Sequence, residues 1–412
     1  MARGANLSGV SSYNRSVILD AIRSTGPISR VELAAATGLT GAAMTNLVRR
    51  LLADGLIEEA GQGASTGGKP RTLLRLNASA GFAVGVLVDV DAISYVVSDL
   101  EGRIVARARA AGVDGSEPLA VLDRVARGIR RVLARSGVPA ERVLGVGMSA
   151  PRPLDQTDGR ALRSPAHLER WRRVPVRERL EELVGHPVLL SNDANAVVLG
   201  EHWLAPDARA AGNVLCVFLG ELGIGSGILL NGKLVLGSSP HAGEIGHLSL
   251  NVDGETCFCG NRGCLELYSS PHAVAAAARA HNAGGAGEPI ALATGGGARS
   301  DVAAVRRAVA EGHPHATDLV RRSARYVGSA VQLVVDLLDL QLVIFAGHGF
   351  GAIGHLYVEA AQVALRRLGE TKTGRTYSVR LSTLGSGEDA AAVGAAALVL
   401  HRHFEPALQP KP

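Results

Sequence analysis

The sequence predicts an α/β protein in two parts, a small helical module with a β-hairpin over residues 1–80 and a two-lobed body over residues 81–412. Three observations predict this fold class. The first eighty residues show three short helical patterns and then two strand patterns. The body holds two copies of one strand-turn-strand pattern, 130 residues apart. Helical patterns follow these copies, around 117–135, 270–282 and 314–338, as expected for two α/β lobes around a cleft.

The composition is that of a globular chain whose positive charge is concentrated near its start. Hydrophobic residues make up 47% of the 412 residues, which is enough for a proper core in each part. The net charge is +5, and residues 1–80 hold nine Lys and Arg against five Asp and Glu. This excess suits a nucleic-acid-binding module, although a solvated basic face is the simpler alternative. Asp336 and Asp339 interrupt the most apolar stretch, so we expect no membrane span and a cytoplasmic location.

Three helices are expected in the first part. Apolar residues gather on one side of Asn14–Ser24, which predicts a first helix. Ser29 and Glu32 form the spacing of a capping box and predict a second helix, which Gly38 ends. Thr40 then caps a third helix after a tight turn. This order is that of a helix-turn-helix, whose second member enters the major groove of DNA.

The third helix carries small and polar residues on one side and leucines on the other. We expect its polar side to face the bases, with Thr40, Thr45, Asn46 and Arg49 as candidate contacts to base edges and Arg50 on phosphate. A three-helix module that binds another protein is the alternative to DNA binding.

The segment "LIEEAGQGASTGGKPRTLLRLN" predicts two strands around a glycine-rich tip, which is the wing of a winged helix. Lys69 and Arg71 belong to this tip and could lie along a narrow minor groove. A plain domain linker is the alternative for the tip. Helices, wing and basic excess together predict a winged helix-turn-helix that binds double-stranded operator DNA.

Three of the four cysteines lie within eight positions. Cys257, Cys259 and Cys264, with His247 ten residues before the first of them, make a Cys₃His set. Such a set suits a closed tetrahedral site with no open position, so it predicts a structural Zn²⁺ ion. Buried free thiols are the alternative. A disulfide is less favoured, because no secretory signal pattern is visible and the compartment is then reducing.

The body resembles the ROK family (repressors, open reading frames and sugar kinases). The matching motifs, in family order, are "SNDANAVVLGE" from 191, "GIGSGILLNGKLVLG" from 223, "AGEIGHLSL" from 242 and "CFCGNRGCLE" from 257. With the winged helix they cover almost the whole chain, and the last motif is very specific. The resemblance implies the two-lobed actin-like (hexokinase-type) ATPase fold over residues 81–412, with a zinc-bound loop over residues 247–266.

The resemblance also implies a sugar site. In the family, sugar hydroxyls are held by residues that match Asn192, Asp193, Glu244, His247 and Glu266, and the position of Asp193 is the general base in the kinases. The chemistry agrees, because each carboxylate can accept hydrogen bonds from two hydroxyls. A zinc-bound histidine has a fixed ring and can offer its second nitrogen to a ligand. The alternative is that these residues are surface acids and helix caps.

One position on the sugar side departs from the family. In "RSPAHLERW" the family commonly has Asn where this chain has His167. His167 could donate to a hydroxyl or exclude the usual hexose, so the sequence leaves open which sugar or sugar phosphate binds.

The nucleotide elements depart further. The family's phosphate loops, Asp-x-Gly-Gly-Thr and Gly-Thr-Gly-x-Gly, are "DVDAI" and "ELGIG" here. Asp91 and Glu221, which the ungapped repeat aligns, would each face an anionic phosphate chain. At about 4 Å and an effective dielectric near 20, one such pair costs on the order of 4 kcal/mol, part of which Mg²⁺ could absorb. "VIFAGHG" also has His348 where paired glycines are usual, so we expect ATP and Mg²⁺ not to bind.

Three hypotheses follow. The first is a sugar-responsive DNA-binding transcriptional regulator, with repression favoured, that forms a homodimer or homotetramer and reads an inverted repeat. The second is an ATP-dependent, glucokinase-like sugar kinase with an appended DNA-binding domain, in which Asp193 is the base and Asp89 helps to place Mg²⁺. The third is a regulator that has lost ligand control.

Overall fold

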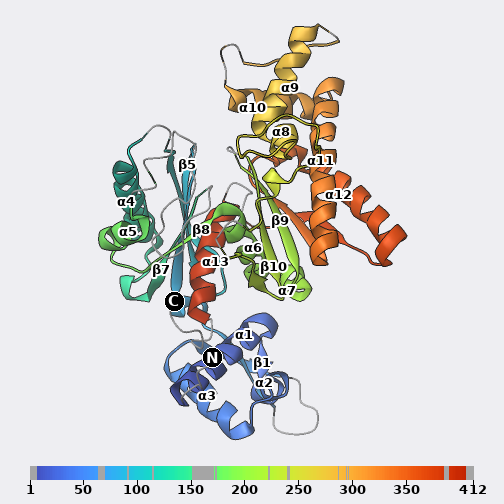
Figure 1. The fold of residues 1–412 in the computed structure, drawn as a ribbon. Coiled ribbons are helices and arrows are strands. Elements are labelled where there is room, and N and C mark those ends of the chain that lie inside the picture. Colours follow the sequence, from blue (N-terminus) through green and yellow to red (C-terminus); the bar gives the residue numbers. More distant parts are fainter. Residues whose placement is uncertain are drawn as a thin grey trace.

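The molecule consists of a small N-terminal head and two larger α/β lobes (Figure 1). Four positions singled out from the sequence, Lys69, Asp91, His167 and Glu221, lie outside the residues that the structure describes. The computed structural model describes residues 7–63, 70–90, 92–113, 116–150, 171, 174–220, 223–238, 242–285, 287–293, 295, 297–384 and 389–404. No helix in this part of the chain is both long and apolar enough to cross a membrane.

The three helices of the head confirm the predicted helix-turn-helix. They are α1 (Leu7–Thr25), α2 (Arg30–Thr37) and α3 (Gly41–Ala53). The capping box of α2 is present, because Ser29 accepts from the Glu32 N–H while the Glu32 carboxylate accepts from the Ser29 N–H. Gly38 ends α2 with a φ of 70°, a left-handed conformation that favours glycine, and Thr40 caps α3. The first helix begins seven residues before the predicted start at Asn14.

A three-stranded antiparallel sheet completes the winged helix. Its strands are β1 (Ile28–Ser29), β2 (Ile57–Gln62) and β3 (Thr72–Leu76), in the order β1-β3-β2. The sequence predicted β2 and β3 but not β1, because two residues are too few to show a strand pattern. In the head, Leu33, Val48 and Leu74 are fully buried, and the apolar cluster that they belong to continues into the body.

The two lobes are built on sheets of identical strand order. In each, three antiparallel strands are followed by two parallel ones, as expected for one unit used twice. Lobe I has the order β6-β5-β4-β7-β8, with β4 (Phe82–Val88), β5 (Ala92–Asp99), β6 (Ile104–Ala111), β7 (Val143–Ala150) and β8 (Val188–Asn192). Lobe II has the order β11-β10-β9-β12-β13, with β9 (Val214–Leu219), β10 (Ile224–Leu230), β11 (Lys233–Leu234), β12 (Leu342–Ala346) and β13 (Ser378–Leu381).

The first hairpins of the two copies correspond at an offset of 131, not 130. The Asp89 N–H donates to the Ala92 carbonyl, and the Gly220 N–H donates to the Gly223 carbonyl, so these two pairs close equivalent turns. The ungapped alignment was therefore wrong here: Glu221 corresponds to Val90 and not to Asp91. The physical reason is that the next turn of the first copy, closed by Asp99 N–H and Arg103 carbonyl, is one residue longer than its counterpart.

Helices cover both faces of each sheet. The outer face of lobe I packs against α4 (Pro118–Ser136) and α5 (Val176–Val184), and that of lobe II against α11 (Pro314–Leu338) and α12 (Gly354–Leu368). The inner faces pack on α13 (Ala390–Phe404) and α6 (Asp193–Leu204), which lie against each other between the sheets (Figure 1). The remaining helices are α7 (Pro206–Ala211), α8 (Glu266–Ser269), α9 (Pro271–Gly284), α10 (Ala298–Ala310), the short 3₁₀ turns η1 (Ala78–Ala80), η2 (Ala140–Arg142), η4 (Ile245–His247) and η5 (Gly351–Ile353), and a π turn, η6 (Gly369–Thr373).

Backbone atoms touch directly between the two inner helices. A Cβ atom on Gly394 of α13 would overlap the Ala196 carbonyl of α6, and one on Gly227 of β10 would overlap the Ala194 carbonyl. On the other side, a Cβ on Gly85 of β4 would overlap a carbonyl of α13. Because no side chain separates these elements, α6 and α13 have little freedom to slide against each other.

Candidate functional sites

The predicted DNA-contacting residues lie on the exposed face of α3. Thr45, Asn46, Arg49 and Arg50 are exposed, whereas Met44, Leu47, Val48 and Leu51 bury the opposite face. The Arg49 guanidinium donates to the Asn46 side-chain oxygen at 3.2 Å. Thr40 is exposed as well, but its hydroxyl already accepts from the Ala43 N–H. The four α3 side chains therefore form one polar surface that can face DNA.

Arg71 lies at the base of the wing. It is exposed, and its charge acts on Glu32 at the start of α2, whose pKa is lowered by hydrogen bonds from Ser29 and further by Arg71. This position brings the wing close to the helix-turn-helix. Contacts of these residues with DNA remain a prediction.

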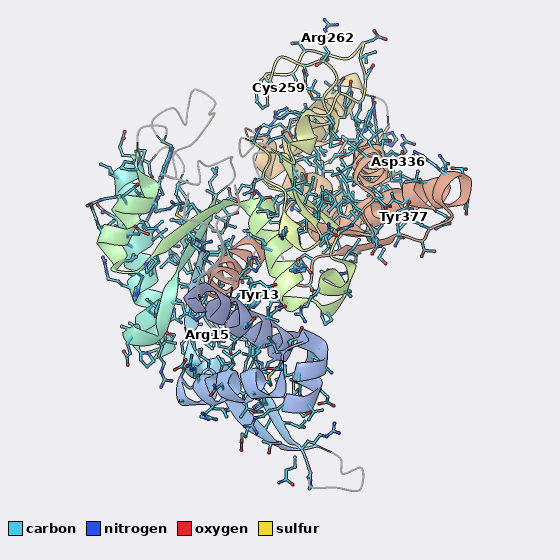
Figure 2. All side chains as sticks on the ribbon, turned by 60° about the horizontal axis from the view of Figure 1, so that its bottom comes forward. Tyr13, Arg15, Cys259, Arg262, Asp336 and Tyr377 are labelled. Carbon is cyan, nitrogen blue, oxygen red and sulfur yellow. The ribbon has the colours of Figure 1, made fainter. Side chains whose placement is uncertain are left out.

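The four predicted metal ligands come together. The donor atoms of His247, Cys257, Cys259 and Cys264 all lie within 4.8 Å of one another. His247 Nδ1 is 3.7 Å from Cys257 Sγ, and Cys259 Sγ is 3.6 Å from Cys264 Sγ. A tetrahedral Zn²⁺ with Zn–S bonds of about 2.3 Å needs neighbouring ligands about 3.8 Å apart. The spacing and the donor types thus fit a structural zinc ion. The candidate zinc site is remote from the head, because Figure 2 shows Cys259 far from Arg15 on α1.

The backbone of the zinc loop, residues 247–266, arranges these ligands. Cys257 N–H donates to the Asn261 carbonyl, and Gly260 N–H donates back to the Cys257 carbonyl, which closes a tight turn. Gly263 has a φ of 59°, and a Cβ there would overlap the Asn251 carbonyl, so this position requires glycine. The Leu265 N–H donates to the Leu248 carbonyl at 2.9 Å. That bond holds the start of α8 beside the segment that follows His247.

The predicted sugar-binding residues lie on two supports. Asn192 and Asp193 begin α6, where the Asn192 side-chain oxygen accepts from the Asn195 N–H. Glu244, His247 and Glu266 are carried by the zinc loop and the turn before it. The Glu266 carboxylate accepts from the Ile224 N–H at 3.2 Å, which places it against the start of β10. A zinc ion bound there would stabilise the segment that carries three of the five residues.

Four carboxylates lie close enough to affect one another's charge. One of them, Asp89, was not among the predicted sugar-binding residues. Burial, together with the charges of Asp89 and Glu244 and against the hydrogen bond from the Ala194 N–H, raises the pKa of Asp193 to about 7. Burial also raises the pKa of Glu266 to about 7, again with Glu244 contributing. We call Asp89, Asp193, Glu244 and Glu266 the acid cluster. From the sequence, Asp89 was expected only to help place Mg²⁺ in a kinase. That expectation came from its position as the first residue of "DVDAI".

The segment "VIFAGHG", residues 343–349, where the family usually has paired glycines, packs tightly against β9. The Gly349 N–H donates to the Leu219 carbonyl at 3.0 Å, and the His348 carbonyl accepts from Arg306 at 2.6 Å. A Cβ on Gly347 would overlap the Leu219 carbonyl. Glycine at 347 and 349 is thus required by packing against β9, so these glycines say nothing about a nucleotide.

Replacing one metal ligand should release the ion and destabilise the protein together. We expect Cys257→Ser to lose its zinc and to unfold at lower urea concentration, because metal binding and folding are coupled at such sites. Zinc per chain, measured by elemental mass spectrometry, checks the first effect. Cys216→Ser is the matched control, since Cys216 is buried in β9 and this variant should keep its zinc whatever its stability. Full zinc content in Cys257→Ser would contradict the assignment.

Burial of Asp193 should make stability depend on pH. With a folded pKa of about 7 instead of 3.8, native Asp193 holds a proton that the unfolded chain releases between these values, so stability falls as pH rises. Asp193→Asn keeps an acceptor for the Ala194 N–H but cannot ionise. The variant should therefore gain on the order of 3 kcal/mol relative to the parent between pH 5 and pH 8. Urea unfolding of both proteins at the two pH values, without sugar, measures this difference. An equal difference at both would show that Asp193 is not perturbed.

Comparisons with known proteins agree with both parts of the fold. Residues 83–402 match the model of the ROK family, and residues 12–64 match that of the MarR family. A crystal structure of a ROK family transcriptional regulator, a homolog of the E. coli MLC protein, has a TM-score of 0.80 at 22% identity and covers 97% of this chain and 98% of its own. This likeness shows the fold of nearly the whole chain.

Curated relatives include a regulator and an enzyme. The xylose repressor of Bacillus subtilis (strain 168) is 32% identical over 270 residues, which are 66% of this chain and 69% of the repressor. The glucokinase of Streptomyces coelicolor is 30% identical over 290 residues, which are 70% of this chain and 88% of the kinase. Because the family model covers well over half of the sequence, the chain belongs to the ROK family.

Proposed function

We propose that the protein is a sugar-responsive DNA-binding transcriptional regulator, with repression as the favoured direction. The observation that carries this is the joining, in one chain, of a winged helix-turn-helix to a ROK body. The similarity to a xylose repressor supports it. We place its action in the cytoplasm, where operator DNA is accessible.

The acid cluster is suited to a ligand rich in hydroxyl groups. Burial disfavours the ionised form of these carboxylates, as the raised pKa values of Asp193 and Glu266 indicate. Sugar hydroxyls would donate to these oxygens and replace the water that burial removes. The amide NH₂ group of Asn192 can donate to the ligand, because its helix cap uses only the oxygen. A zinc ion would add no chemistry of its own and would hold His247 and Glu266 in place.

On the DNA side, the polar surface of α3 would enter the major groove. Asn46 and Arg49 are placed for base edges and Arg50 for phosphate, with Arg71 and Lys69 near the minor groove. A homodimer or homotetramer would bring two heads to an inverted repeat whose half-sites are about 34 Å apart or a multiple of it. Tenfold weaker operator binding on sugar addition requires about 1.4 kcal/mol of coupling.

A sugar kinase is the second candidate function. It is favoured by the similarity to a glucokinase and by the raised pKa of Asp193, because a base near pH 7 is efficient in proton transfer. Against it stand the carboxylates of Asp91 and Glu221 in the two turns that would hold phosphates. Each of these acids would add repulsion against an already anionic phosphate chain.

A thermal-shift screen with and without nucleotide separates the two candidates. We expect D-xylose, D-glucose or one of their phosphates to raise Tm, since a ligand at one hundred times its Kd stabilises by about 2.7 kcal/mol. ATP with Mg²⁺ should add nothing to that rise. A coupled assay for ADP should stay at background. Sugar-dependent ADP release at ordinary kinase rates, abolished by Asp193→Ala, would instead establish the kinase.

One arginine of α3 tests the DNA surface. Arg49→Ala should weaken binding to an operator duplex selected from random sequence, by about 1–3 kcal/mol if Arg49 contacts a base. Fluorescence anisotropy at several salt concentrations measures this loss. Arg179→Ala, on α5 of lobe I, is the matched control and should bind as the parent does. Equal affinity of both variants would remove α3 from the interface.

A further inference from the structure

One nearly buried arginine joins the head to the body. Arg23, in the last turn of α1, has a side chain only 7% exposed. Its Nη1 donates to the Trp203 carbonyl at 2.7 Å, and its guanidinium carbon lies 3.9 Å from the centroid of the Trp203 ring. Asp20, one turn earlier, accepts from Nη2 at 2.6 Å and fixes the orientation of the guanidinium. A cation, a carbonyl and an aromatic face thus meet in one contact that excludes water.

Trp203, the partner of Arg23, lies in the last turn of α6, beside the end of α13. Trp203 is 3% exposed, and its ring lies 5.2 Å from that of Phe404, at the end of α13. Its carbonyl also accepts from Arg209 at 2.6 Å. Figure 2 shows α1, marked by Tyr13 and Arg15, against this end of α13, and the two helices are in contact. The cores of the head and of the inner helices form one continuous apolar cluster.

The same helix that carries Trp203 in its last turn begins at the proposed sugar site. Asn192 caps α6 and Asp193 is its first residue. Ten steps at 1.5 Å each place Trp203 about 15 Å from Asp193 along the helix. Residues 193–201 of α6 are all buried. The backbone contact of Ala196 with Gly394 leaves little room for bending. A displacement at Asp193 is therefore transmitted to Trp203 as a movement of the whole helix.

The head is attached to lobe I at a second place. The Leu100 N–H, at the end of β5, donates to the Ala78 carbonyl at 3.1 Å, and Arg142 donates to the Ser79 carbonyl at 3.1 Å. Both carbonyls belong to η1, which connects the winged helix to β4. The head is thus held by lobe I through η1 and by α6 through Arg23. The close packing of α6 on α13 resists sliding, so the movement that we consider is a small rotation of α6, together with lobe II, relative to α13 and lobe I. In such a rotation the head must turn as well or lose one of the two contacts.

We propose that Arg23 and Trp203 are the positioning residues that transmit sugar binding from Asp193 to the winged helix. The inference rests on the proposed sugar-responsive function and names its route. A sugar that binds one position of α6 more tightly shifts the population toward that position, and the Arg23–Trp203 contact converts the shift into a different placement of the head. The Arg23–Trp203 contact has one residue in the head and one in α6. Its removal should therefore uncouple sugar binding from operator binding without altering the residues of either site.

Tryptophan fluorescence tests the route without DNA. The chain has two tryptophans, so Trp171→Phe leaves Trp203 as the only one. Whichever of D-xylose, D-glucose or their phosphates raises Tm should also change the Trp203 emission, with the same half-saturation. An unchanged emission at a saturating sugar concentration would contradict the proposal. If none of these sugars binds, the proposed function is overturned and this inference with it.

Operator binding provides the second test. In the parent we expect saturating sugar to change the operator Kd about tenfold. Arg23→Gln should reduce this ratio below about threefold while the sugar Kd stays the same, and Arg23→Lys, which keeps the cation, should restore part of it. Arg30→Gln is the matched control in the head. Arg30 pairs with Glu59 at 3.9 Å, within the head itself, so this variant should keep the parental ratio. A folded Arg23→Gln variant that keeps the parental change of operator Kd on sugar addition would overturn the proposal. If Arg23→Gln fails to fold, Trp203→Phe tests the same contact from the side of the body.

Discussion

The close backbone packing of α6 against α13 is the constraint on which the rest of the structure depends. Gly394 and Gly200 let the two helices meet without side chains between them, and Gly85 and Gly227 let each helix meet its own sheet in the same way. The two lobes are thereby joined through a thin, stiff pair of helices. One of these helices carries Asp193 at its start and Trp203 near its end, so ligand chemistry and head placement share one rigid element.

The zinc loop carries the other residues of the proposed sugar site. His247 is one of the four candidate metal ligands, and Glu266 lies two residues beyond another, Cys264. The acid cluster formed there carries a free-energy penalty from burial, seen in the raised pKa of Asp193. A ligand that donates hydrogen bonds to these carboxylates would relieve this penalty.

Features of the sequence that depend on near neighbours were predictable, and contacts between distant segments were not. The capping box of Ser29 and Glu32 and the Cys₃His set follow from spacing alone, and both are present in the structure. Strand β1 was missed because its pairing with β3 is set across more than forty residues. The Arg23–Trp203 contact joins positions 180 residues apart, and no local pattern marks either residue. The nearness of Asp89 to Asp193 was not predicted for the same reason, because it exists only in the folded chain.

Hydrogen exchange on sugar addition tests most directly whether α6 connects the two sites. In the intact protein, with a sugar that raises Tm, we expect slower exchange of the amides at the start of α6 and, in the same experiment, altered exchange in the part of α1 that carries Arg23. Changes confined to the start of α6 and the zinc loop, with α1 exchanging as before, would contradict the account.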